Sequence, residues 1–216
     1  MQLTLYYFDI PFWRAEVSRL ALFIGEIPFE NYLIKKKDYD LFKKSGELPN
    51  KKIAPFKQLP VLEVDGQIIA QTSAIARYCG KLSGLYPKKN DYEAALIDQV
   101  IDAAQDINYI VTTSSRDKER KKIAREILSV KHLPKWFRFL EELIKKNKES
   151  IWFVGNKITI ADLAIWRLLG WLSSGMLDGV PSNILEPYVN LKKMRDEVYK
   201  HPKVKEWMLK NYGKII

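Results

Sequence analysis

The sequence Pro60-Val-Leu-Glu-Val-Asp-Gly-Gln-Ile-Ile-Ala-Gln-Thr72 contains the clearest β-hairpin signal in the chain. Two apolar segments flank the dipeptide Asp65-Gly66. Because Asp-Gly tolerates the positive φ angles of a tight reversal, we expect the two segments to pair as antiparallel strands. Thr72 is a suitable N-cap for a helix from Ser73 to Leu82. The segment therefore predicts a hairpin that leads directly into a helix.

The segment before this hairpin alternates strand and helix signals. Leu3 to Phe8 is short, apolar and aromatic, which is typical of a strand buried on both faces. From Arg14, apolar residues recur at helical spacing until Gly25, a common helix stop. A second strand is predicted near Phe29 to Ile34, and Lys43 to Ala54 is expected to be a loop. The first part of the chain is thus predicted to be a βαβ–ββα unit.

Beyond the predicted linker at residues 83–90, the chain reads as helical throughout. One long helix is predicted from Asp91 to about Ser115, and Leu133-Pro134 predicts a break before the next helix. Two more helices are predicted near the C-terminus, over Tyr188–Val198 and from Pro202 to about Tyr212.

The strongest local signal in the second half lies around Thr159 and Asp162. Thr159 can cap a helix start while Asp162 reaches back to it, which is the pattern of a capping box, and Ile158 can pack onto Leu163 across that start. The helix that follows, Ile160–Leu172, is apolar nearly all round, so we expect it at the centre of the helical domain.

These elements predict an α/β fold joined to an all-α fold. Residues 1–82 would form a thioredoxin-like βαβ–ββα domain, and residues 91–216 an all-helical domain. A redox-active thioredoxin-like domain carries Cys-x-x-Cys in the turn after the first strand. Residues 6–14 contain no cysteine, so disulfide exchange by the protein itself is excluded. A hydroxyl at the end of that strand could instead act on a thiol that arrives as a substrate.

Composition excludes several other kinds of protein. The 216 residues include 36 Lys and Arg against 26 Asp and Glu, and 47% are hydrophobic, which predicts a globular chain. The single cysteine, Cys79, excludes a disulfide framework and a multi-thiolate metal site, and we interpret it as a buried apolar residue. The lysine clusters are scattered among acids, so no nucleic-acid partner is expected. We expect no membrane span and no signal peptide, and therefore a cytoplasmic protein.

Four segments resemble, in order, the motifs of one enzyme family. They are Tyr7–Glu16, Pro55–Leu62, Gln71–Tyr78 and Thr159–Asp162. Through them the chain resembles the cytosolic glutathione transferases of the tyrosine type, nearest in character to the sigma, alpha, mu and pi classes. The resemblance implies a homodimer that uses glutathione as co-substrate without another cofactor. It also implies that the helical domain forms the side for a hydrophobic substrate.

By this resemblance, Tyr7 donates a hydrogen bond to the glutathione sulfur and favours the nucleophilic thiolate. A hydrogen bond to a charged group contributes about 1.5–3 kcal/mol. Since one pKa unit corresponds to about 1.36 kcal/mol, the thiol pKa would fall by about one to two units. The alternative is that Tyr7 only packs in a buried strand. Tyr6 lies on the opposite strand face and serves as an internal comparison.

The resemblance also assigns residues to the glutathione backbone. Gln71 and Thr72 open a predicted helix and would hold the γ-glutamyl carboxylate, because free amides at a helix start bind carboxylates. A cis bond is implied between Leu59 and Pro60, so that Leu59 would pair with the cysteinyl backbone with Gln58 nearby.

For the glycyl carboxylate, the resemblance places Lys43 with Tyr39 one helical turn before it and Arg14 at the start of the first helix. Lys51 and Lys52 are alternatives to Lys43, because the segment from 43 to 54 is longer than in many relatives.

Three acids, Asp98, Asp102 and Asp106, repeat every four residues on the predicted long helix. Like charges at this spacing destabilise a helix slightly, so a compensating cation is plausible. By resemblance, the pair Gln105-Asp106 matches the position that reaches across a dimer interface towards the substrate ammonium. Asp98 and Asp102 are interpreted as a solvated acidic face.

The loop after the first strand departs from the family pattern. Between Asp9 and Arg14 the chain has Ile-Pro-Phe-Trp, one residue more than usual. Because this loop overhangs the sulfur in relatives, the extra bulk would reshape the pocket for the second substrate. The candidates for that pocket, any of which is alternatively a core residue, are Phe12, Trp13, Tyr109 and Tyr212.

The sequence therefore predicts a glutathione transferase that adds the thiol to a small hydrophobic electrophile. A glutathione-dependent isomerase or peroxidase on the same scaffold is the alternative among enzymes. A non-enzymatic ligand-binding or assembly module of this fold is the alternative outside enzymology.

Overall fold

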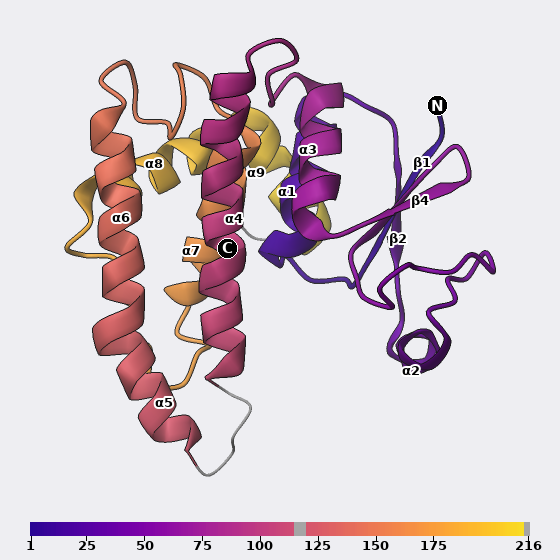
Figure 1. Ribbon diagram of the computed structural model, residues 1–216, viewed down its shortest axis with the longest axis horizontal. Coiled ribbons are helices and arrows are strands. Elements are labelled where there is room, and N and C mark those ends of the chain that lie inside the picture. Colours follow the sequence, from indigo (N-terminus) through magenta and orange to yellow (C-terminus); the bar gives the residue numbers. More distant parts are fainter. Residues whose placement is uncertain (115–119, 214–216) are drawn as a thin grey trace.

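Figure 1 shows the computed structural model, in which residues 1–114 and 120–213 are described. A four-stranded sheet with the order β2-β1-β3-β4 lies on one side of the molecule. β1 pairs with β2 in parallel and with β3 in antiparallel fashion, and β3 and β4 form the predicted hairpin. The strands are β1 (Leu3–Tyr7), β2 (Glu30–Leu33), β3 (Val61–Val64) and β4 (Gln67–Ala70).

Two helices separate the sheet from the rest of the chain. α1 (Trp13–Ile24) and α3 (Thr72–Ser83) pack against each other and lie between the sheet and the long helices (Figure 1). A third helix, α2 (Lys36–Ser45), lies apart from them near the end of the sheet. The prediction of a loop from Lys43 is wrong at its start, because α2 continues to Ser45 before Gly46 takes a left-handed φ of 78°.

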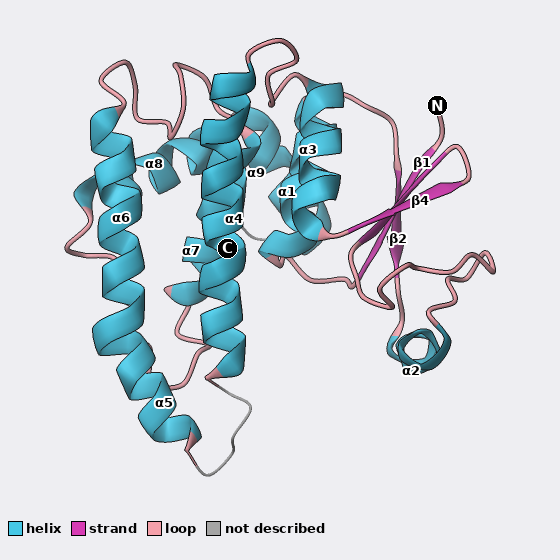
Figure 2. Ribbon diagram, viewed as in Figure 1, coloured by secondary structure: helices cyan, strands magenta, loops and turns pink. Residues whose placement is uncertain are grey.

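The remaining helices form the second half of the molecule (Figure 2). They are α4 (Asp91–Thr113), α5 (Lys121–Ile127), α6 (Leu133–Lys146), α7 (Ile160–Leu172), α8 (Val189–Lys200) and α9 (Pro202–Tyr212). α7 contacts α1, α4 and α8, so it occupies the centre as predicted. α4 follows its prediction as far as Thr113, whereas Ser115 lies outside the described residues.

The start of α7 confirms the capping box. The Thr159 hydroxyl accepts from the Ala161 amide at 3.3 Å, and the Asp162 carboxylate accepts from the Thr159 amide at 2.7 Å. Asp162 also accepts from the Phe153 amide at 2.9 Å, which ties the preceding loop to the helix. Because Asp162 is fully buried, burial raises its pKa to about 6 against the opposing effect of these hydrogen bonds.

Two local predictions are wrong. Leu133-Pro134 does not interrupt the helix. A π-helical turn over Leu128–His132 joins α5 to α6, and the proline occupies the first turn of α6, where its missing N–H is not needed. Thr72 is not an N-cap, because α3 already begins at Thr72 and Gln71 precedes it in the cap position.

Within the described residues, no helix is both long enough and apolar enough to cross a membrane. Cys79 is 0% exposed, as interpreted from the sequence, and burial raises its thiol pKa to about 12.

Candidate functional site

A small polar pocket lies where the hairpin meets α3. The Leu59–Pro60 peptide bond at its edge is cis, as the resemblance implied. The pocket gathers side chains from the start of α1, the segment before β3, the start of α3 and the middle of α4. Its lining residues are Arg14, Phe56, Gln58, Leu59, Pro60, Ala70, Gln71, Thr72 and Gln105.

The backbone at the start of α3 shapes one wall of this pocket. Gln71 has φ 76° and ψ 124°, a region that L-residues other than glycine rarely adopt and that costs about 1–2 kcal/mol. Thr72, the first residue of the helix, is 3% exposed. The first amides of a helix have no partners within it, and they carry the positive end of the helix dipole. This wall can therefore bind a carboxylate.

Arg14 contributes an unsatisfied cation to the same pocket. Its Nε atom is buried and has no hydrogen-bond partner among the described residues. A buried donor of this kind normally finds an acceptor. Arg14 also lowers the pKa of Tyr7, an effect that requires the two side chains to be close. A negatively charged ligand would satisfy this guanidinium.

Tyr7 lies at the end of β1, beside the pocket and not in its lining. The residue is 5% exposed, and the Arg19 guanidinium lies 5.7 Å from its ring centroid. Burial raises the pKa of Tyr7 to about 12, and the charges of Arg14 and Arg19 only partly offset this. The phenol is therefore protonated at neutral pH and acts as a hydrogen-bond donor. Its hydroxyl has no hydrogen-bond partner in the part of the chain that the structure describes.

Tyr6 differs from Tyr7 in the state of its hydroxyl. It is also buried, but its hydroxyl donates to Glu63 Oε2 at 2.9 Å. Burial and the hydrogen bond to Glu63 both raise the pKa of Tyr6. Of these two neighbouring phenols, only Tyr7 keeps its proton available for a ligand.

A buried charge cluster, which sequence reasoning missed, holds the loop that follows Tyr7. Arg19 donates to the carbonyl oxygens of Phe8 at 2.8 Å and Ile10 at 3.1 Å. Its charge is balanced by Glu16 at 3.1 Å, and both side chains are 0% exposed. Glu16 also accepts from the Tyr212 hydroxyl at 2.8 Å. The cluster thus links the C-terminal helix to the loop over the site.

The four candidates for the hydrophobic substrate do not come together in one wall. Trp13 is 0% exposed and its indole donates to Asn108 Oδ1 at 3.2 Å, so it is a core residue and the prediction for it is wrong. Tyr212 belongs to the charge cluster. Phe12 is half-buried against the Trp171 ring, whereas Tyr109 is 60% exposed.

The lysines proposed for the glycyl carboxylate are in different situations. Lys51 pairs with Glu47 at 2.8 Å and Lys52 with Glu63 at 2.6 Å, so both charges are already balanced. Lys43 Nζ instead lies 5.8 Å from the Tyr39 ring centroid. Neither Lys43 nor Tyr39 lines the polar pocket.

The three acids in the row on α4 differ in their partners. Arg77 on α3 is the compensating cation, at 2.6 Å from Asp98 and 3.1 Å from Asp102, so a purely solvated face is the wrong interpretation of these two acids. Asp106 is exposed, and its neighbour Gln105 lines the pocket. Successive helix residues point about 100° apart, so only one of the pair can face the pocket within this chain.

Among the described residues, no group of His, Cys, Asp or Glu is arranged to hold a metal ion. The pocket instead offers a helix start, an unpaired guanidinium, exposed amide side chains and a nearby free phenol. Such a set suits a ligand that has carboxylates, a peptide backbone and a nucleophilic atom to stabilise.

Comparisons with known proteins cover both halves of the chain. Residues 3–81 match the family model for the glutathione S-transferase N-terminal domain, and residues 105–211 match that for the C-terminal domain. The chain is 31% identical to glutathione S-transferase 1 of Ascaris suum, over 96% of this chain and 95% of that protein. It is 29% identical to hematopoietic prostaglandin D synthase of Gallus gallus, over 91% and 90%.

Solved structures give the same result. The glutathione S-transferase of Ascaris lumbricoides superposes with a TM-score of 0.81 at 30% identity, covering 98% of both chains. The prostaglandin synthase D of Nilaparvata lugens has a TM-score of 0.82 at 29% identity, covering 97% of this chain and 98% of that one. Because two family models together span both halves of the chain and a relative is aligned over almost its whole length, the chain belongs to the glutathione S-transferase family.

Proposed function

We propose that this protein is a glutathione transferase that binds glutathione beside the cis Leu59–Pro60 bond and activates its sulfur with Tyr7. The observation that carries the proposal is the pair of unsatisfied donors at one end of the sheet: the free Tyr7 hydroxyl and the buried Arg14 Nε. The thiolate then attacks a small hydrophobic electrophile.

The high pKa of Tyr7 supports a role as donor in preference to base. At a pKa of about 12, the phenol keeps its proton at neutral pH and can donate it in a hydrogen bond to a thiolate. The nearby cation Arg14 favours the negative sulfur as well. Together these groups stabilise the charged nucleophile without taking part in the covalent change.

The other roles follow from positions in the pocket. Gln71 and Thr72 at the start of α3 would hold the γ-glutamyl carboxylate, and Leu59 would pair with the cysteinyl backbone, with Gln58 beside it. Lys43 and Tyr39 on α2 would meet the glycyl carboxylate, because Lys51 and Lys52 are engaged with acids.

The wider arrangement is also a proposal. Residues 1–82 would act as the glutathione-binding domain, 83–90 as the linker and 91–216 as the side for the hydrophobic substrate, with Phe12 and Tyr109 as its remaining candidates. Asp106, which is exposed, would contact the substrate ammonium bound to a partner subunit in a cytoplasmic homodimer that works in detoxification. Family membership supports each of these points.

An isomerase is the second candidate, because relatives of nearly full length are named as prostaglandin D synthases. Such an activity would use the same thiolate but would return glutathione unchanged. Measuring whether glutathione is consumed separates the two activities.

The proposed function is tested by glutathione-affinity capture followed by conjugation to a generic aryl halide. We expect the parent and Tyr7→Phe to be captured equally, and turnover in Tyr7→Phe to fall at least about tenfold, or ~1.4 kcal/mol at the transition state. Tyr6→Phe is the matched control, because it removes a hydroxyl that is already bonded to Glu63. Equal turnover in all three proteins would assign the sulfur to another donor.

A further inference from the structure

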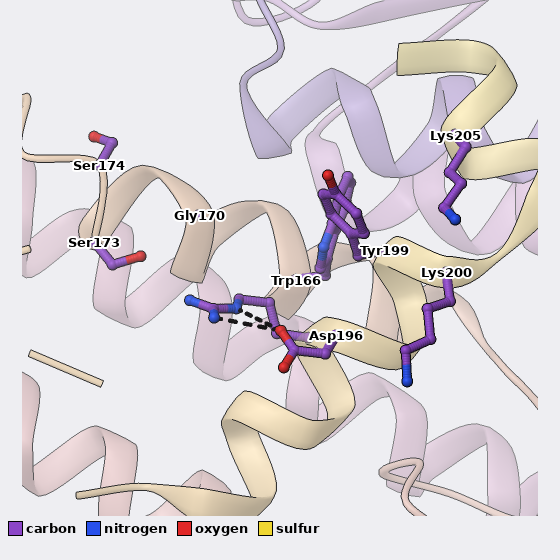
Figure 3. A pocket seen from close by; sticks show the side chains of 9 residues that line it. Trp166, Gly170, Ser173, Ser174, Asp196, Tyr199, Lys200 and Lys205 are labelled. Atoms are coloured by element: carbon purple, nitrogen blue, oxygen red, sulfur yellow. Dashed lines mark hydrogen bonds and ion pairs between the residues drawn. The ribbon is translucent and has the colours of Figure 1, made fainter. Parts of the chain in front are cut away.

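The central helix α7 has two faces that meet different parts of the molecule. One face, to which Trp166 and Gly170 belong, lines a cavity of about 650 Å³ against α8 and the start of α9 (Figure 3). The residues that follow these two in the sequence, Arg167 and Trp171, are not part of the described lining of this cavity. They contact the loop that joins Tyr7 to α1.

Arg167 holds the backbone of this loop from the helical domain. Its Nε donates to the carbonyl oxygen of Pro11 at 2.8 Å, although the two residues are 156 positions apart in the sequence. The Arg167 side chain is buried, and its guanidinium stays charged at neutral pH. Because a charged donor makes a stronger hydrogen bond than a neutral one, Arg167 restricts where Pro11 can lie.

Trp171 holds the side chain of the next residue in the loop. The ring centroids of Trp171 and Phe12 lie 5.0 Å apart with an interplanar angle of 82°, which is the edge-to-face arrangement that aromatic pairs favour. Trp171 comes four residues after Arg167 and therefore lies on the same face of α7. One helix face thus fixes two consecutive loop residues, Pro11 by its carbonyl and Phe12 by its ring.

Phe12 lies between this helix face and the region around Tyr7. Its side chain packs against the main core, to which α7 belongs, and also against the smaller core cluster that contains Tyr7 and Ala15. Phe12 is only half-buried, so part of its ring remains accessible to a ligand. A group bonded to a sulfur atom beside Tyr7 would therefore meet this ring.

The start of α1 does not depend on Arg167. Two amides in the first turn of α1 donate to the carbonyl oxygen of Phe12 at 3.2 and 3.1 Å, and Glu16 is paired with Arg19 at 3.1 Å. Substituting Arg167 leaves these contacts in place. We therefore expect Arg14, on the same helix, to keep its position in the polar pocket.

We propose that Arg167 is a positioning residue that sets the specificity for the hydrophobic group of the second substrate. By fixing Pro11, it holds the Phe12 ring as a preformed wall for the group that becomes bonded to the glutathione sulfur. A preformed wall binds such a group without the entropic cost of ordering the loop. The inference rests on the proposed function, because it requires glutathione to bind beside Tyr7.

The test compares the binding of glutathione, S-methylglutathione and S-benzylglutathione to the full chain by titration calorimetry. The three compounds share the tripeptide and differ only in the group on sulfur, and no turnover is needed. In the parent, S-benzylglutathione should bind at least about tenfold more tightly than S-methylglutathione, because its ring buries apolar surface.

In Arg167→Met, which removes the donor but keeps an unbranched side chain, this preference should fall at least about threefold. The affinity for glutathione itself should stay within about twofold of the parent, which also shows that the variant is folded. Arg167→Lys keeps a charged donor on a chain of similar length, so it should retain more of the preference than Arg167→Met.

Trp171→Ala tests the other half of the contact and should lower the preference in the same way, because it removes the ring that Phe12 packs against. Trp136→Ala is its matched control. It removes one ring of an edge-to-face pair with Phe139 on α6, at 6.1 Å between centroids, and should leave the preference unchanged.

Arg195→Met is the matched control for the arginine, because it removes a guanidinium from a partly exposed pair with Asp196 at 3.3 Å. The inference alone is overturned if the parent binds glutathione and Arg167→Met keeps the full preference, or if Arg195→Met lowers it equally. An equal loss of glutathione affinity in Arg167→Met would show a general structural role and would also overturn it. A parent that does not bind glutathione overturns the proposed function and this inference with it.

Discussion

Removing the charge of Glu16 should destabilise the protein strongly, because this carboxylate is the only anion that is paired with Arg19 among the described residues. Both side chains are 0% exposed, and the carboxylate also accepts from Trp207 and Tyr212. Glu16→Gln keeps the shape of the side chain but leaves the buried Arg19 cation without a counter-charge. It also replaces one carboxylate oxygen, which accepts hydrogen bonds, with an NH2 group that faces other donors. Breaking a buried pair from one side costs about 3–5 kcal/mol.

The prediction is measured by urea unfolding at one fixed protein concentration, with tryptophan fluorescence as the signal. Glu186→Gln is the control, because its partner Lys192 lies at 2.6 Å in a largely exposed pair. Such a surface pair contributes at most about 1 kcal/mol. A loss in Glu16→Gln no larger than in Glu186→Gln would refute the view that the cluster fastens the C-terminal helix and the loop after Tyr7.

Two further predictions follow from other buried groups. Cys79, whose thiol pKa burial raises to about 12, should not react with a disulfide reagent in the native protein near about pH 8, but should react fully after unfolding; reaction in the native state would contradict its burial. Asp162 has a pKa of about 6 in the folded protein, above the value of 3.8 for a free aspartate. The protonated carboxyl therefore contributes its full stability below pH 3.8, and this contribution is lost as the pH rises through 6. The difference in unfolding free energy between the parent and Asp162→Asn should therefore shrink by up to about 3 kcal/mol from pH 4 to pH 7, and a constant difference would show that the carboxyl titrates normally.

Features encoded by neighbouring residues could be predicted from the sequence. The hairpin at Asp65-Gly66 and the capping box at Thr159 depend on contacts a few residues apart, and both are present. Helix α2 was not predicted, because it is mostly polar and buries a single residue, Phe42, so it has little apolar periodicity.

Contacts between distant residues were not readable from the pattern. Arg19 and Tyr212 are 193 positions apart, and nothing in the local sequence of either signals the buried cluster. Trp13 was misplaced for the same reason, since its partner Asn108 lies on α4. For the polar pocket, the residues came from the family resemblance. Gln105 was named only as the neighbour of Asp106, because no signal in the sequence tells which of two adjacent helix residues faces inward.

The central claim is that the Tyr7 hydroxyl lowers the pKa of a bound glutathione thiol. The most direct measurement is the ultraviolet absorbance of the thiolate in the binary complex, titrated with pH for the parent, Tyr7→Phe and Tyr6→Phe. We predict a bound thiol pKa about one to two units below that of free glutathione in the parent and in Tyr6→Phe, with the shift lost in Tyr7→Phe. The same depressed pKa in Tyr7→Phe would contradict the account.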